Sequence, residues 1–118
     1  MPSKKEKRGH ERILLADVRG MVEHSNTSRP VTLVNASVQG VCIAGEAIEA
    51  GTVVRLSIED NMGVGGISLY CRSAWSSEKT RQEKLTGLTL LNTNRVLFTK
   101  DLAAYGRLLE TARTSRGA

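Results

Sequence analysis

The sequence predicts an all-β fold, a six-stranded antiparallel β-barrel with a C-terminal α-helix and a flexible basic N-terminal arm. Residues 13–93 are a succession of short runs rich in β-branched residues, each bounded by Gly, Asn, Asp, Ser or Pro, which is typical of consecutive antiparallel strands. No helical pattern separates these runs, and closure into a barrel would hide the edges of the sheet. From about Asn94 the apolar period becomes that of a helix, and 118 residues fit a single domain.

The arm, residues 1–12, is the basic segment "MPSKKEKRGHER". Between Ser3 and Arg12 it carries five Lys or Arg and two Glu, so its net charge is five minus two, or +3, within a chain of net charge +5. Gly9 and the strand that starts at Ile13 favour an extended arm. The arm is therefore suited to anions, although a solvated tail without a specific partner has the same composition.

Six strand-forming runs follow the arm: "ILLADVRGMVE", "RPVTLVNAS", "QGVCIAGEAIEAG", "TVVRLSIED", "VGGISLYCRSAW" and "KLTGLTLLN". The polar segments "EDNMGVGG" and "SSEKTRQEK" suit hairpin turns. Alternation in "ISLYCRSAW" places Ile67, Leu69, Cys71 and Trp75 on one face, interrupted at Ser73. We expect the opposite face to be solvated.

The stretch "LVNASVQG", residues 33–40, places an amide and a hydroxyl two residues apart. Side chains alternate along a strand, so we expect Asn35 and Ser37 on one side and Val34 and Ala36 on the other. A strand that runs into a turn explains the pattern, because Asn and Ser hydrogen-bond their own backbone. A second explanation is a binding patch on the strand.

Residues 94–113 are predicted to form the helix. Phe98, Leu102, Tyr105 and Leu109 stand at i, i+4, i+7 and i+11 and form one apolar stripe, which we expect to dock on the barrel or across its mouth. The last residues, 114–118 or "TSRGA", carry no helical pattern and are predicted to be a disordered tail.

Several functional classes are disfavoured. Cys42 and Cys71 lie in apolar runs far from one another, so we expect buried thiols, and neither they nor His10 and His24 have neighbours at metal-ligand spacing. No apolar run approaches the roughly 20 residues of a membrane helix, and no secretory signal follows the basic start, so we expect a cytoplasmic protein. We find no catalytic constellation and expect neither an enzyme nor a cofactor.

Two motifs together resemble those of a known family. "RGHER" matches the RxxxR motif and "NASVQG" the (D/N)xSxxG motif of the PilZ domain, a bacterial receptor module for cyclic di-GMP with a split β-barrel. The motifs occur in the family's order, and the resemblance extends from about Arg8 to Glu110. It implies a cyclic di-GMP effector that orders its arm around the ligand and signals through a protein partner, in motility, exopolysaccharide production or virulence.

The resemblance also implies the site residues. Arg8 and Arg12 would clamp phosphate and guanine acceptors, because guanidinium stays charged, binds in a bidentate manner and stacks on rings. Asn35 and Ser37 would donate and accept hydrogen bonds at a guanine edge. Gly40 would take a positive φ and leave room for the ligand.

Two further residues are possible ligand contacts: Lys7, at a position that varies in the family with the number of bound ligands, and Trp75, which resembles a late-strand aromatic residue of some members. Two alternatives stay open. One is a small basic barrel that binds nucleic acid through its charge, although an aromatic content of 3% offers few stacking platforms. The other is a PilZ-like adaptor that does not bind the ligand.

Overall fold

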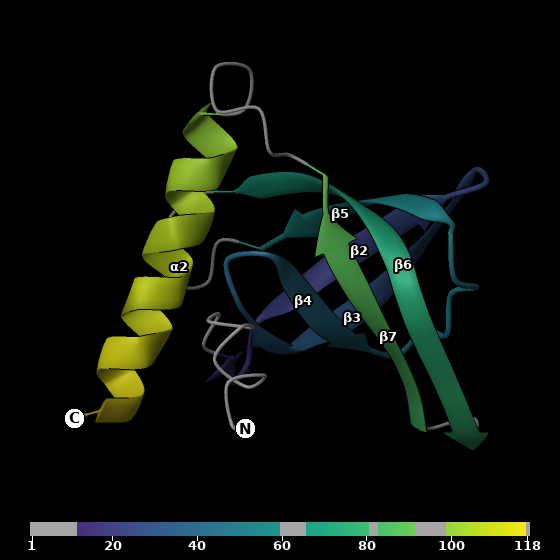
Figure 1. Ribbon diagram of the computed structural model, residues 1–118, viewed down its shortest axis with the longest axis horizontal. Helices are drawn as coiled ribbons and strands as arrows, with labels where there is room; N and C mark the ends of the chain where they lie inside the picture. The colour runs from purple at the N-terminus through teal and green to yellow at the C-terminus, as the bar shows by residue number, and fades with distance from the viewer. Residues whose placement is uncertain (1–11, 60–65, 81–82, 92–98, 118) are drawn as a thin grey trace, which may run out of the picture.

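The computed structural model describes residues 12–59, 66–80, 83–91 and 99–117. The elements are β1 (Ile13–Leu14), β2 (Arg19–His24), β3 (Thr27–Ala36), β4 (Gly40–Ala44), β5 (Val53–Ile58), β6 (Ile67–Thr80), β7 (Glu83–Leu90) and α2 (Thr99–Gly117) (Figure 1). The sheet order is β1-β3-β2-β5-β6-β7-β4, and β3 also pairs with β4. This pairing closes the six strands β2 to β7 into an antiparallel barrel, so the predicted barrel with a C-terminal helix is confirmed.

The first predicted run, "ILLADVRGMVE", is two strands instead of one. Asp17 has a φ of 57° and interrupts the extended backbone between β1 and β2. The short β1 pairs with the end of β3, with Ile13 opposite Ala36 and Leu14 opposite Asn35. Of the predicted arm, only Arg12 belongs to the described residues, and it leads directly into β1.

The barrel interior is filled by one aliphatic residue or more from each strand. Each of Val22, Leu33, Ile43, Leu56, Leu69 and Leu88 is at most 3% exposed. Full burial of such a side chain contributes about 1.5 to 3 kcal/mol, so this interior dominates the stability of the domain. Cys42 and Cys71 are buried free thiols, as predicted.

Strands β6 and β7 differ from the prediction in two respects. The polar segment predicted as a turn is largely strand, because β6 continues to Thr80 and β7 begins at Glu83, with Glu78 opposite the oppositely charged Lys84. The predicted inward position of Trp75 is wrong, since the indole-bearing residue is 44% exposed. A register shift between Ser73 and Trp75 adds one residue to β6 and reverses the faces beyond it.

Helix α2 lies beside the barrel, on the side away from the C-terminal end of β6 (Figure 1). It presents the predicted stripe to the barrel, with Tyr105 and Leu109 buried and Leu102 partly buried, whereas Phe98 lies outside the described residues. The helix continues to Gly117, past the predicted end at 113, and Thr114 Oγ1 donates to the Glu110 carbonyl within it. No helix among the described residues is long and apolar enough to cross a bilayer.

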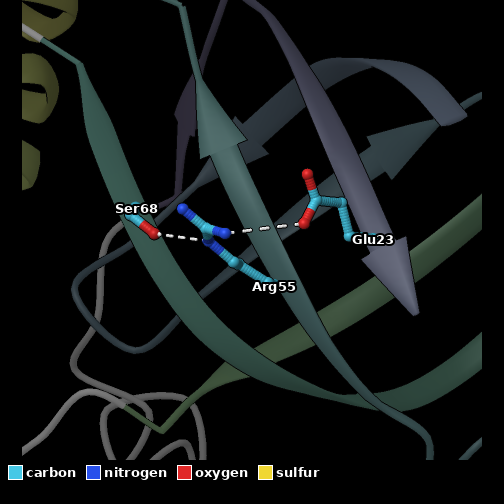
Figure 2. A network of polar contacts seen from close by, with 3 residues as sticks. All are labelled: Glu23, Arg55 and Ser68. Atoms are coloured by element: carbon cyan, nitrogen blue, oxygen red, sulfur yellow. Dashed lines mark hydrogen bonds and ion pairs between the residues drawn. The ribbon is translucent and has the colours of Figure 1, made fainter. Parts of the chain in front are cut away.

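A polar network on the outside of the barrel connects three strands with the helix. Arg55 Nη1 lies 3.6 Å from Glu23 Oε1, and Arg55 Nε donates to Ser68 Oγ at 3.1 Å, so β2, β5 and β6 are joined (Figure 2). The Ser68 amide donates to Asp101 Oδ1 of α2 at 3.1 Å. This contact satisfies a backbone donor of β6 beyond the end of its pairing with β7 and fixes the first turn of the helix.

Candidate functional site

The second motif ends in a tight turn between β3 and β4. The Ser37 amide donates to the Gly40 carbonyl at 2.8 Å, and the Gln39 amide donates to Ser37 Oγ at 3.2 Å. Ser37 is only 4% exposed. Its hydroxyl therefore holds the turn, which is the first of the two explanations that the sequence allowed for this residue.

Gly40 serves a purpose different from the predicted one. Its φ is not positive, since Gly45 and Gly51 are the positive-φ glycines of the described chain. A Cβ at Gly40 would instead collide with the carbonyl oxygen of Leu88 in β7. The glycine is required because β4 and β7 approach closely at this point, with Gly40 opposite Thr89.

Asn35 and Ala36 lie on opposite faces of β3, as predicted, but the predicted alternation fails at Val34. Leu33 pairs with Ile43 and Asn35 with Cys42, so Val34 is an extra residue that forms a bulge in β3. The bulge turns Ala36 into the core, where it is fully buried, and leaves Asn35 partly exposed on the outside. Ser37 follows the end of the strand and belongs to the turn.

A row of paired residues crosses the outer face of the barrel from Asn35 to Trp75. Leu14 pairs with Asn35, Asn35 with Cys42, Cys42 with Gly87, and Gly87 with Trp75. Directly opposed residues of antiparallel strands project from the same face. The indole of Trp75 covers Gly87, since a Cβ at Gly87 would collide with the ring. We call these five residues the outer row.

Arg12 lies close to the outer row and to the turn. Burial raises the pKa of the Cys42 thiol, and the positive charge of Arg12 partly opposes this rise. Burial likewise raises the pKa of the Tyr105 hydroxyl, with a further rise from Cys71 and an opposing effect of Arg12. Arg12 is exposed, and its positive charge acts on both the Cys42 thiol and the Tyr105 hydroxyl.

The structure thus brings together some of the predicted site residues. Asn35 and Trp75 belong to the outer row, and the charge of Arg12 acts on Cys42 between them. Ser37 and Gly40 shape the turn that follows Asn35. Lys7 and Arg8 lie outside the described residues. The described residues contain no group of three or more His, Cys, Asp or Glu that could hold a metal ion.

Sequence reasoning missed two residues of this region. Gly87 interrupts a strand interior, where glycine is unfavourable, and that position could have indicated a close approach. Tyr105 was recognised as part of the helical stripe, but its hydroxyl contacts residues more than 60 positions away, at Ser37 and Gly40. No local pattern indicates such a partner.

Solved structures with the same arrangement include a PilZ domain. The PilZ domain of YcgR from Escherichia coli, solved with c-di-GMP, has a TM-score of 0.71 and 12% identity, and the match covers 91% of this chain and 92% of that one. The Bacillus subtilis inhibitor of motility, MotI or DgrA, has a TM-score of 0.59 and 13% identity, covering 86% of this chain and 51% of that one. PlzA of Borreliella burgdorferi in complex with c-di-GMP has a TM-score of 0.53 and 13% identity, covering 84% and 44%.

The chain therefore spans about half the length of the two latter proteins. No family model and no curated protein matches the sequence. At such low identity the likeness concerns the fold, and the chain has the fold of a PilZ domain.

Proposed function

We propose that this chain, with its PilZ fold, is a receptor for cyclic di-GMP that acts through a protein partner and is not an enzyme. The observation that carries the proposal is the outer row, in which Asn35 and Trp75 lie in register on one outer face with Arg12 beside them. Solved proteins of the same fold with c-di-GMP bound support it.

The chemistry of the row suits a ligand with two phosphates and two guanines. Arg12, together with Arg8, would neutralise phosphate and donate to the guanine acceptors O6 and N7. The Asn35 amide would pair with a guanine edge, and Trp75 offers a ring face for stacking. Three strand spacings of about 4.8 Å separate Asn35 from Trp75, roughly 14 Å in all, so a ligand that touches both must be larger than one base.

Ser37 and Gly40 belong to the proposal as residues that shape the site. The Ser37 hydroxyl holds the turn that follows Asn35, and Gly40 permits β4 to pack against β7. We therefore assign the direct contacts to the arginines, Asn35 and Trp75, with Lys7 as an additional cation of the arm.

The signal would pass when the arm closes over the ligand and presents a new surface to the partner. Because this ligand is a bacterial second messenger, the proposal places that action in the cytoplasm.

Calorimetric titration with cyclic di-GMP tests the proposal and also gives the number of ligands bound. The double variant Arg8→Ala with Arg12→Ala is expected to weaken binding by about 3 kcal/mol or more, since each charge-assisted contact contributes about 1.5 to 3 kcal/mol. The double variant Arg29→Ala with Arg107→Ala removes the same charge from exposed positions of β3 and α2 and is the matched control.

Two results would contradict the proposal. If cyclic di-GMP produces no heat and no amide shifts at saturating concentration, the chain is not a receptor for it. If single-stranded or duplex nucleic acid binds with a steep salt dependence while the cyclic dinucleotide does not, the basic barrel acts through its charge instead.

A further inference from the structure

Tyr105 of α2 reaches from the helix into the turn of the second motif. Its hydroxyl donates to the Ser37 carbonyl at 2.7 Å and is 3.0 Å from the Gly40 carbonyl, so one proton is shared between the first and last residues of the turn. The whole residue is 3% exposed. The contact therefore joins α2 and the turn through a buried polar interaction.

The turn depends on this donor. The Gly40 carbonyl also accepts a hydrogen bond from the Ser37 amide, whereas the Tyr105 hydroxyl is the one hydrogen-bond donor seen at the Ser37 carbonyl among the described residues. A buried carbonyl that loses its partner costs more than the net value of the bond, because it is not rehydrated. Burial raises the pKa of Tyr105, so the hydroxyl keeps its proton at neutral pH and stays a donor.

The turn lies between two parts of the proposed site. It follows Asn35 and Ala36 of β3 and leads into β4, where Cys42 continues the outer row. On the side of β4, the bulge at Val34 leaves Asn35 with only one further paired residue before the turn, whereas β1 pairs with Asn35 and Ala36 on the other side. The position of Asn35 relative to β4 therefore depends in part on whether the turn is held.

We propose that Tyr105 is a positioning residue of the cyclic di-GMP site, which holds the turn at residues 37–40 and couples the site to α2. This inference rests on the proposed function. We call the hydrogen bonds from the Tyr105 hydroxyl to the Ser37 and Gly40 carbonyls the latch. If the latch favours the conformation that binds the ligand, then by thermodynamic linkage the ligand stabilises the latch by the same factor. Binding of the ligand would then strengthen the attachment of α2 to the turn.

The variant Tyr105→Phe tests the inference in the full chain. Phenylalanine keeps the ring in the hydrophobic core cluster that also contains Leu108 and Leu109, so the fold is retained while the hydroxyl is lost. We expect the amides of Ser37 and Gln39 to exchange with solvent about tenfold faster without ligand, and the dissociation constant for cyclic di-GMP to rise about tenfold.

Two controls separate positioning from general destabilisation. Leu108→Val loosens the packing of α2 but keeps the hydroxyl, and Tyr70→Phe removes a hydroxyl from the exposed face of β6. Neither is expected to change the exchange of the two turn amides or the affinity by more than about twofold. A loss of affinity that followed stability alone would appear in Leu108→Val as well.

Each outcome decides the inference. Unchanged exchange of Ser37 and Gln39 in Tyr105→Phe would overturn the latch, and faster exchange with unchanged affinity would overturn the positioning role. If the wild-type chain does not bind cyclic di-GMP, the proposed function and the positioning role fall together. In that case, amide exchange of Ser37 and Gln39, compared between the unliganded wild type and Tyr105→Phe, still decides whether Tyr105 holds the turn.

Discussion

Gly87→Ala is expected to displace the Trp75 indole from the outer row without unfolding the barrel. A Cβ at position 87 would lie 2.9 Å from Trp75 Cδ1 and closer still to Nε1 and Cε2. Carbon atoms rest in contact at about 3.5 to 4.0 Å, so the ring must retreat by roughly 1 Å or more. The ring belongs to an exposed side chain that can move, and we therefore expect a loss of less than about 1 kcal/mol in the free energy of unfolding.

The effect on binding follows from the lost stacking surface. Stacking of a base on an aromatic ring contributes about 1 to 3 kcal/mol, so cyclic di-GMP should bind about tenfold more weakly or worse. Trp75 is the only tryptophan of the chain, and its emission reports the displacement directly. Gly66→Ala is the matched control, because nothing lies within 4 Å of a Cβ at that glycine.

A double-mutant cycle shows whether Trp75 is the cause. In the Trp75→Ala background, Gly87→Ala should have no further effect on affinity, since the ring that it displaces is already absent. An equal loss in both backgrounds would show that the strand itself, and not the indole, is disturbed. Unchanged emission together with unchanged affinity would refute the assignment of Trp75 to the site.

Three more predictions concern stability, each measured by urea unfolding. Gly40→Ala should lower the free energy of unfolding by about 2 kcal/mol or more, because its Cβ meets the Leu88 backbone, which cannot move aside; a neutral result would refute the close approach. Gly106→Ala should raise it by about 0.5 to 1 kcal/mol, since this exposed helical glycine has open space around it, and a loss would indicate a contact of α2 that the structure lacks. Burial raises the pKa of Cys71 from 9.0 to about 12, so the folded state holds its proton more tightly. Stability should therefore fall as pH rises from about 9 to 12, by up to about 1.4 kcal/mol per unit from this thiol, and less so in Cys71→Ala.

Local patterns were enough to predict much of the fold. The apolar period after Asn94 indicated the face of α2 that packs on the barrel, and Tyr105 and Leu109 are buried there. The runs of β-branched residues indicated the strands, and their number and the absence of helices between them indicated closure. The thiols at Cys42 and Cys71 are buried as their apolar surroundings suggested.

The errors share one cause, which is pairing between distant strands. Alternation counts residues along a single strand, but the extra residues at Val34 and Ala74 reverse the faces beyond them and are defined only against β4 and β7. For this reason the predicted alternation fails at Val34, and Trp75 was assigned to the face of β6 that carries Ile67 and Leu69. The polar end of β6 was assigned to a turn, because its pairing with β7 leaves no apolar signal.

By itself, the sequence determined the class of fold, the buried stripe of the helix and the residue types of the two motifs, since these depend on periodicity and side-chain chemistry close in the chain. Only the tertiary structure decided which of those residues face outward together, why Gly40 must be glycine and where the Tyr105 hydroxyl donates. The physical reason is that register, bulges and close backbone approach arise when segments far apart in sequence pack against one another, and alternation within one segment carries no record of them.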